Sequence, residues 1–167
     1  MNDVFNKAFE ITIGHEGGYV NDPHDNGGET KYGISKKAYP NIDIKNLSLE
    51  DARGLYYKNY WNTKRARLWK LPDSIAIEVF DTAVNMGSSR AFKMLQESLN
   101  LLNRNETRFD DLKVDGWIGD ATIKAIEKVK ESELLKVLNG LQFTRYLEIV
   151  KNNESQERFF AGWIKRT

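Results

Sequence analysis

The sequence predicts an all-α, mainly helical fold with one small irregular or β-containing loop region. Two observations predict it. Apolar residues recur at helical spacing along most of the 167-residue chain, and one polar, glycine-rich stretch, residues 17–30, interrupts that pattern. Size agrees, because a chain of this length buries roughly 70% of its unfolded surface and needs no disulfide or metal to fold.

The first expected helix covers residues 2–16. Asn2 or Asp3 caps it, and its apolar face ends at Glu16, before two glycines stop the helix. The glycine-rich loop follows, with a weakly strand-like stretch at residues 31–34, and a helical turn is expected over residues 35–39.

Two more helices are expected before residue 88. Ser48 opens a capping box, so a helix over residues 48–60 presents one apolar and aromatic face. Pro72 suits a first helical turn. The stripe from Ile75 to Met86 has a clear 3.6-residue period, which indicates the central buried helix.

Four further helices are expected after Gly87: residues 88–102, 121–129, 132–150 and 155–165. A serine or an aspartate is expected to cap each of the first three. A polar stretch, residues 103–111, is the clearest internal boundary among them.

Composition excludes several classes of site and partner. With no cysteine, a disulfide framework, a thiol nucleophile and a thiolate metal site are impossible. A net charge of +1, from 25 basic and 24 acidic residues, gives no electrostatic case for nucleic acid or a membrane surface. No window approaches the ~18 apolar residues of a membrane span, and the N-terminal segment lacks the pattern of a secretory signal. We expect a monomer made in the cytoplasm without a signal peptide, with no nucleic-acid partner and no stable membrane association.

Glu16 is the candidate for acid chemistry. A helix C-terminus carries partial negative charge, which together with partial burial should raise the pKa of this carboxyl group. A carboxylic acid still protonated near neutral pH can protonate the leaving oxygen of a glycosidic bond. The alternative is a solvated glutamate at a frayed helix end. The long loop that follows, with Tyr19, Tyr32 and Ile34 as apolar anchors, favours an ordered functional site.

Two strings carry a family resemblance: EGGYVNDP from residue 16 and GGETKYGIS from residue 27. With later segments such as residues 80–87 and 114–119, they resemble glycoside hydrolase family 108, the peptidoglycan N-acetylmuramidases of bacteria and phages. The resemblance covers nearly the whole chain. It implies a lysozyme-like helical fold, with a catalytic part at residues 1–87 and a peptidoglycan-binding-like part at residues 88–167, packed as one body. It also implies hydrolysis of the β-1,4 bond between N-acetylmuramic acid and N-acetylglucosamine in glycan strands, without a cofactor.

The second catalytic group has four candidates: Asp22, Asp25, Glu29 and Thr30. Asp25 follows Glu16 by nine residues and Thr30 follows Asp25 by five, which is similar to the pattern of phage-type lysozymes. The resemblance implies that Asp25, or else Asp22, positions a water or stabilises the oxocarbenium-like state, and that Thr30 helps to orient the water. Ordinary turn chemistry is the alternative for both aspartates.

The residues expected to bind substrate combine rings, which stack on sugar faces, with polar groups: Tyr19, Asp22, Tyr32, Asn85 and Trp117. Trp61 is a further candidate ring. For each ring, core packing is the alternative. Trp117 also lies in a D-G-x-x-G-x-x-T turn, whose role is structural in the alternative interpretation.

Two other function classes stay open. A metal-dependent peptidoglycan amidase or peptidase would use His15, Asp22, His24 and Asp25. However, the zincin pattern fails because Tyr19 replaces its second histidine, and the chain holds only two histidines, so we expect no metal. The other class is a non-catalytic wall-binding or secretion-accessory protein. For the muramidase, we expect action on the cell wall in the periplasm, after release by a phage holin or export by a dedicated secretion route.

Overall fold

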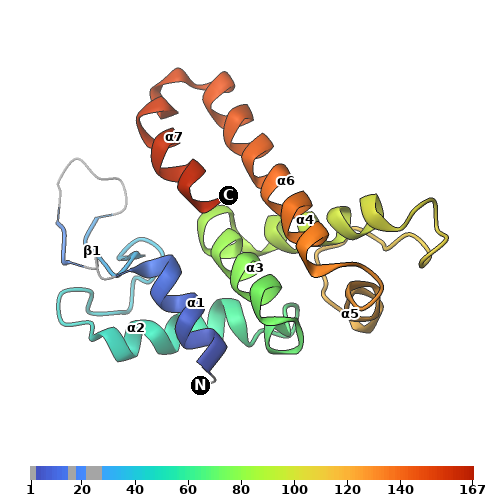
Figure 1. Cartoon of the computed structure of the whole chain (residues 1–167). Coiled ribbons are helices and arrows are strands. Elements are labelled where there is room, and N and C mark those ends of the chain that lie inside the picture. Colours follow the sequence, from blue (N-terminus) through green and yellow to red (C-terminus); the bar gives the residue numbers. More distant parts are fainter. Residues whose placement is uncertain (1–2, 15–17, 22–27) are drawn as a thin grey trace.

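The structure is a computed structural model that describes residues 3–14, 18–21 and 28–167 (Figure 1). The expected mainly-α class is confirmed. The helices are α1 (Asp3–Ile13), α2 (Leu49–Tyr56), α3 (Asp73–Met86), α4 (Ser88–Leu102), α5 (Asp120–Ile126), α6 (Glu131–Asn152) and α7 (Glu157–Trp163). The expected β-containing region is a two-stranded antiparallel sheet of β1 (Thr30–Lys31) and β2 (Ile34–Ser35).

Four short helices of other types complete the chain: a π-helix η1 (Tyr57–Trp61) and 3-10 helices η2 (Leu68–Lys70), η3 (Glu154–Gln156) and η4 (Ile164–Arg166). In the described part, no helix combines the length and apolarity needed to cross a bilayer.

The helix expected over residues 2–16 ends at Ile13, three residues early. Gly14 is the reason: it adopts a left-handed conformation at φ 65°, and its N–H donates to the Glu10 carbonyl at 3.0 Å. Glycine tolerates this conformation at little cost, so the first glycine of the segment closes the helix. The apolar face is as expected, with Phe5, Ala8, Phe9 and Thr12 buried.

α3 is the central helix, as its stripe predicts. It packs against α1, α4 and α6, which surround it in Figure 1. Its buried apolar residues follow the expected period: Ile75, Ala76, Val79, Phe80 and Ala83. Pro72 occupies the cap position with φ −53°, where its missing N–H costs nothing.

The helix expected over residues 48–60 changes its winding at Tyr57. α2 begins as predicted, because the Ser48 hydroxyl accepts the Asp51 N–H at 3.1 Å. η1 then widens the turn, with the Asn62 N–H bonded to the Tyr57 carbonyl at 2.8 Å. Trp61, a candidate sugar-stacking ring, is fully buried against Phe5 and Phe80 at centroid distances of 5.4 and 5.8 Å. It is a core residue.

The predicted serine and aspartate caps of the later helices are wrong. α4 begins at Ser88 with Gly87 in the cap position, α5 begins at Asp120 itself, and α6 begins at Glu131 after Lys130. Within the described residues, none of these three starts has a side-chain cap bond, so packing rather than capping fixes these helices.

One hydrophobic core runs through the chain, from Phe5 in α1 to Leu138 in α6. It crosses the expected boundary at residues 87 and 88 without a break, since α3 and α4 are packed together. The division into residues 1–87 and 88–167 therefore stays a prediction.

Candidate functional site

The described ends of the glycine-rich loop are joined by main-chain hydrogen bonds. Val20 and Thr30 exchange both of their bonds at 2.8 Å, and Thr30 also pairs with Ser35 across the β1–β2 hairpin. The loop thus leaves and re-enters the fold on one small ladder. Glu16, Asp22 and Asp25 lie outside the described residues, as do His15 and His24.

Thr30 is half-buried within this ladder. Its hydroxyl donates a long bond of 3.4 Å to the Gly28 carbonyl. A bond of this length is weak, so the hydroxyl can exchange it for a water or substrate partner. The water-orienting role of Thr30 stays a prediction.

Tyr19 and Glu29 lie beside each other at the same place. Tyr19 is 37% exposed. Desolvation by neighbouring atoms and the Glu29 carboxylate, which accepts a hydrogen bond from the phenol, raise the pKa of Tyr19. Glu29, a candidate for the second catalytic group, is therefore engaged with this ring. Tyr19 therefore offers an exposed aromatic face with a neutral hydroxyl group, a combination that suits contact with a polar ligand.

Tyr32 lies in the hairpin turn, with its backbone left-handed at φ 53°. Its carbonyl accepts the Tyr56 hydroxyl at 3.1 Å, and Lys31 Nζ lies 5.4 Å from its ring centroid. The next residue, Gly33, has φ 73°, and a Cβ there would lie 2.7 Å from the Tyr56 oxygen. The turn is thereby fixed to the aromatic core through Tyr56, whose pKa burial raises above its usual range.

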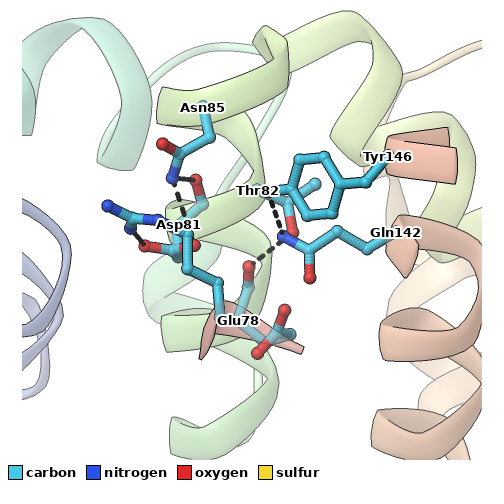
Figure 2. A network of polar contacts seen from close by, with 7 residues as sticks. Glu78, Asp81, Thr82, Asn85, Gln142 and Tyr146 are labelled. Carbon is cyan, nitrogen blue, oxygen red and sulfur yellow. Dashed lines mark hydrogen bonds and ion pairs between the residues drawn. The ribbon is translucent and has the colours of Figure 1, made fainter. Parts of the chain in front are cut away.

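Asn85 lies near the end of α3 and is exposed. Its amide nitrogen donates to two oxygens of Asp81, the carbonyl at 2.8 Å and Oδ2 at 3.1 Å. Arg166, from the C-terminal η4, pairs with the other carboxylate oxygen of Asp81 at 2.7 Å. In Figure 2, Asp81 and Asn85 lie on the side of α3 away from Gln142 and Tyr146 of α6.

Trp117 lies elsewhere. Its ring is 45% exposed, and its main chain is held by Gln96 of α4 and by its own turn residue Asp115. The following Ile118 N–H donates to the Arg65 carbonyl at 2.9 Å. This turn leads directly into α5, which is at the opposite end of the molecule from β1 in Figure 1. The structure thus does not bring Trp117 together with the hairpin.

The Asp115–Trp117 turn has a structural role of its own. Gly116 has φ 75°, and a Cβ there would lie 3.2 Å from the Ser89 carbonyl. Gln96 is buried and bonds Asp115, Gly116 and Trp117 at once. Hydrogen bonds from Gln96 and from the Trp117 N–H lower the pKa of Asp115. The glycine requirement therefore comes from docking on α4.

A groove of about 730 Å³ lies between the start of α4 and α6, lined by Met86, Ser89, Lys93 and Arg145 among others. No residue that the sequence nominates for catalysis or binding is among the described residues that line it, so its volume does not identify the site. Across the described ranges, no group of three or more acidic or histidine side chains is arranged to hold a metal ion.

Comparison with known proteins assigns the family. Residues 9–87 match the family model described as Glycosyl hydrolase 108. Residues 90–167 match the model of a Predicted Peptidoglycan domain. Residues 9–87 belong to glycosyl hydrolase family 108. The chain is therefore a glycoside hydrolase that acts on peptidoglycan.

A solved structure has a similar fold over nearly the whole length of the chain. The structure of Brucella abortus SagA is similar to this hydrolase with a TM-score of 0.73 and 28% sequence identity, over 97% of this chain and 88% of that chain. No significant match is found among curated proteins.

A carboxyl group with a raised pKa was missed by the sequence analysis. Glu78 lies on α3, and burial, followed by the nearby charge of Asp81, raises its pKa to about 7. One carboxyl oxygen is buried without a partner among the described residues. Figure 2 shows Glu78 below Gln142 and Tyr146 of α6. The sequence could have indicated this group, because Glu78 is an acidic residue one turn after Ile75, within the apolar stripe.

Glu78 should make the hydrolase less stable as pH rises. Its folded pKa, about 7, exceeds the ordinary 4.5, so between these values the folded protein keeps a proton that the unfolded chain releases. Stability therefore falls across this window and levels off above it. Glu78→Gln should raise the free energy of unfolding at about pH 8 by up to about 3 kcal/mol, and change it little near pH 4.

Urea unfolding of Glu78→Gln at both pH values measures this difference, with the exposed Glu97→Gln on α4 as the matched control. Because Glu78 faces α6, the variant should keep its hydrolase activity. An equal gain at both pH values would contradict the assigned pKa.

Proposed function

We propose that this hydrolase is an N-acetylmuramidase, which cleaves the β-1,4 bond between N-acetylmuramic acid and N-acetylglucosamine with Glu16 as general acid. The observation that carries the proposal is the match of residues 9–87 to a glycosyl hydrolase family, because Glu16 is the acid of the EGGY string in that segment. In sequence, Glu16 stands between two described anchors, the end of α1 at Ile13 and the ladder residue Val20.

In the proposed mechanism, two carboxyl groups carry out the chemistry and a hydroxyl group assists. Glu16 protonates the glycosidic oxygen as the bond breaks. Asp25 positions the attacking water or stabilises the oxocarbenium-like state, and Thr30 orients that water. Tyr19, Asp22, Tyr32 and Asn85 bind the glycan near the cut.

The place of action follows from the substrate. We propose that the enzyme works on the cell wall as a monomer and reaches it by release or export. The exposed ring of Trp117, distant from the hairpin, would contact a more remote part of the glycan.

The bond that is cut can be identified directly. Walls are digested, the products are reduced with borohydride, and the new ends are assigned by mass spectrometry. Cleavage after N-acetylmuramic acid gives reduced muramic acid ends, and cleavage after N-acetylglucosamine gives reduced glucosamine ends. Only the first result agrees with the proposal.

Glu16→Gln should fold normally and lose at least ~10²-fold in hydrolysis rate, because an amide cannot donate the proton. The assay is release of reducing ends from purified peptidoglycan, with thermal unfolding as the folding check. Glu10→Gln, an exposed glutamate on α1, is the control and should keep full activity. A folded Glu16→Gln variant with near-native rate would remove Glu16 from the mechanism.

Asp25→Asn should impair hydrolysis far more than Asp22→Asn. Its nine-residue offset from Glu16 is similar to the spacing in phage-type lysozymes, whereas Asp22-Pro23 suits an ordinary turn. Rates of both variants on one peptidoglycan preparation test the order. If a stable Asp25→Asn enzyme keeps most of its rate, the aspartate is structural. Glu16 then acts with a water held by neutral groups such as Thr30.

Hydrolysis should survive EDTA, and His24→Ala should cost little in rate. Two histidines and no cysteine are too few for a typical catalytic zinc site without recruiting aspartates. Rates are compared before and after chelation and after zinc is added back. Loss with EDTA and recovery with zinc would support the metal-dependent amidase class instead.

A further inference from the structure

The amide of Asn85 is oriented rather than free. Its nitrogen is directed at two oxygens of Asp81, at 2.8 and 3.1 Å. If the amide were flipped, its oxygen would face both of these Asp81 oxygens and repel them. The hydrogen bonds therefore fix the nitrogen toward Asp81 and the oxygen toward solvent. Asn85 therefore presents its carbonyl oxygen Oδ1 from an exposed position, and this acceptor has no hydrogen-bond partner among the described residues.

Asp81 is fixed in turn by Arg166. The Asp81 side chain is only 8% exposed, and its Oδ1 receives the guanidinium at 2.7 Å. A buried carboxylate is stable only when it is paired and hydrogen-bonded. Arg166 supplies the charge and Asn85 the hydrogen bond, so each group depends on Asp81 for its orientation.

Stacked rings place Arg166 over α3. Trp163 at the end of α7 stacks on Tyr146 of α6, with centroids 5.1 Å apart and planes 19° from parallel. Phe160 of α7 also contacts Phe143 of α6 at 6.2 Å. In Figure 1, α7 turns back beside α6, so that the C-terminus lies at the end of α3. The aromatic pairs thus carry the last turn of the chain to Asp81.

We propose that Arg166 and Asp81 are positioning residues for Asn85, which accepts a hydrogen bond from a hydroxyl or amide N–H of the glycan strand. This inference rests on the proposed function for its substrate. It adds the C-terminal turn to the glycan-binding site: Arg166 holds the Asp81 carboxylate, Asp81 holds the Asn85 nitrogen, and the Asn85 oxygen is left to receive the sugar.

A binding cycle tests this connection. Dissociation constants for solubilised peptidoglycan strands are measured for Asn85→Ala, Arg166→Ala and the double variant, in a Glu16→Gln background that prevents turnover. Each single change should weaken binding by about 2- to 10-fold, the range of one neutral hydrogen bond. The double variant should be no weaker than Asn85→Ala alone, because Arg166 acts through Asn85.

Two further variants separate positioning from general stability. Arg166→Lys keeps a cation that reaches Asp81 and should recover most of the binding. Lys165→Ala removes a neighbouring exposed charge that forms no ion pair among the described residues and should bind like the parent. Circular dichroism sets a temperature at which every variant is folded. In the active enzyme, Arg166→Ala should raise KM by the same factor and leave kcat within about twofold.

Two results would overturn the inference: unchanged binding in Asn85→Ala or Arg166→Ala, or losses that add in the double variant. These results are distinct from failure of the proposed function, which would appear as wild-type protein that binds glycan strands and produces no new reducing ends. In that case the binding cycle still decides the roles of Arg166 and Asp81.

Discussion

The burial of α3 determines which partners its polar side chains need. α1, α4 and α6 pack against it, and Phe80 contacts Phe5, Tyr56 and Trp61 at its centre. A helix enclosed in this way has little contact with water, so each polar side chain on it needs a partner from a neighbouring element. The hairpin depends on the same packing, because Tyr56 contacts Phe80 and also holds the hairpin turn.

Two carboxyl groups on α3 meet this requirement differently. Asp81 receives the Arg166 guanidinium and the Asn85 amide N–H. Glu78, three residues earlier, receives no cation in the described structure, and its pKa rises toward neutrality. A raised pKa in a buried carboxyl group often marks a catalytic acid. Here Glu78 lies beside Gln142 and Tyr146 of α6, and burial together with the nearby charge of Asp81 explains the shift.

Sequence patterns predict what depends on near neighbours. The stripe of α3 and the Ser48 cap are confirmed because spacing of three or four residues determines both. The predicted end of α1 is wrong because Gly14 already adopts the left-handed conformation. This glycine precedes the pair at residues 17 and 18 that was expected to end the helix. The π-winding of η1 and the burial of Trp61 depend on Phe5 and Phe80, which periodicity within one helix cannot reveal. Glu16 and Asp25 stay predictions, since both lie outside the described residues.

The two family matches meet close to Gly87, with one ending there and the other starting at residue 90. The physical interactions do not divide at this point. The pair between Asp81 and Arg166 joins residues 85 positions apart, one from each matched segment. Because the acceptor on Asn85 is oriented through that pair, the peptidoglycan-domain segment would contribute to substrate binding at α3 as well as through its own surface. A chain shortened before residue 164 would keep all of α3 and lose the cation that stabilises Asp81.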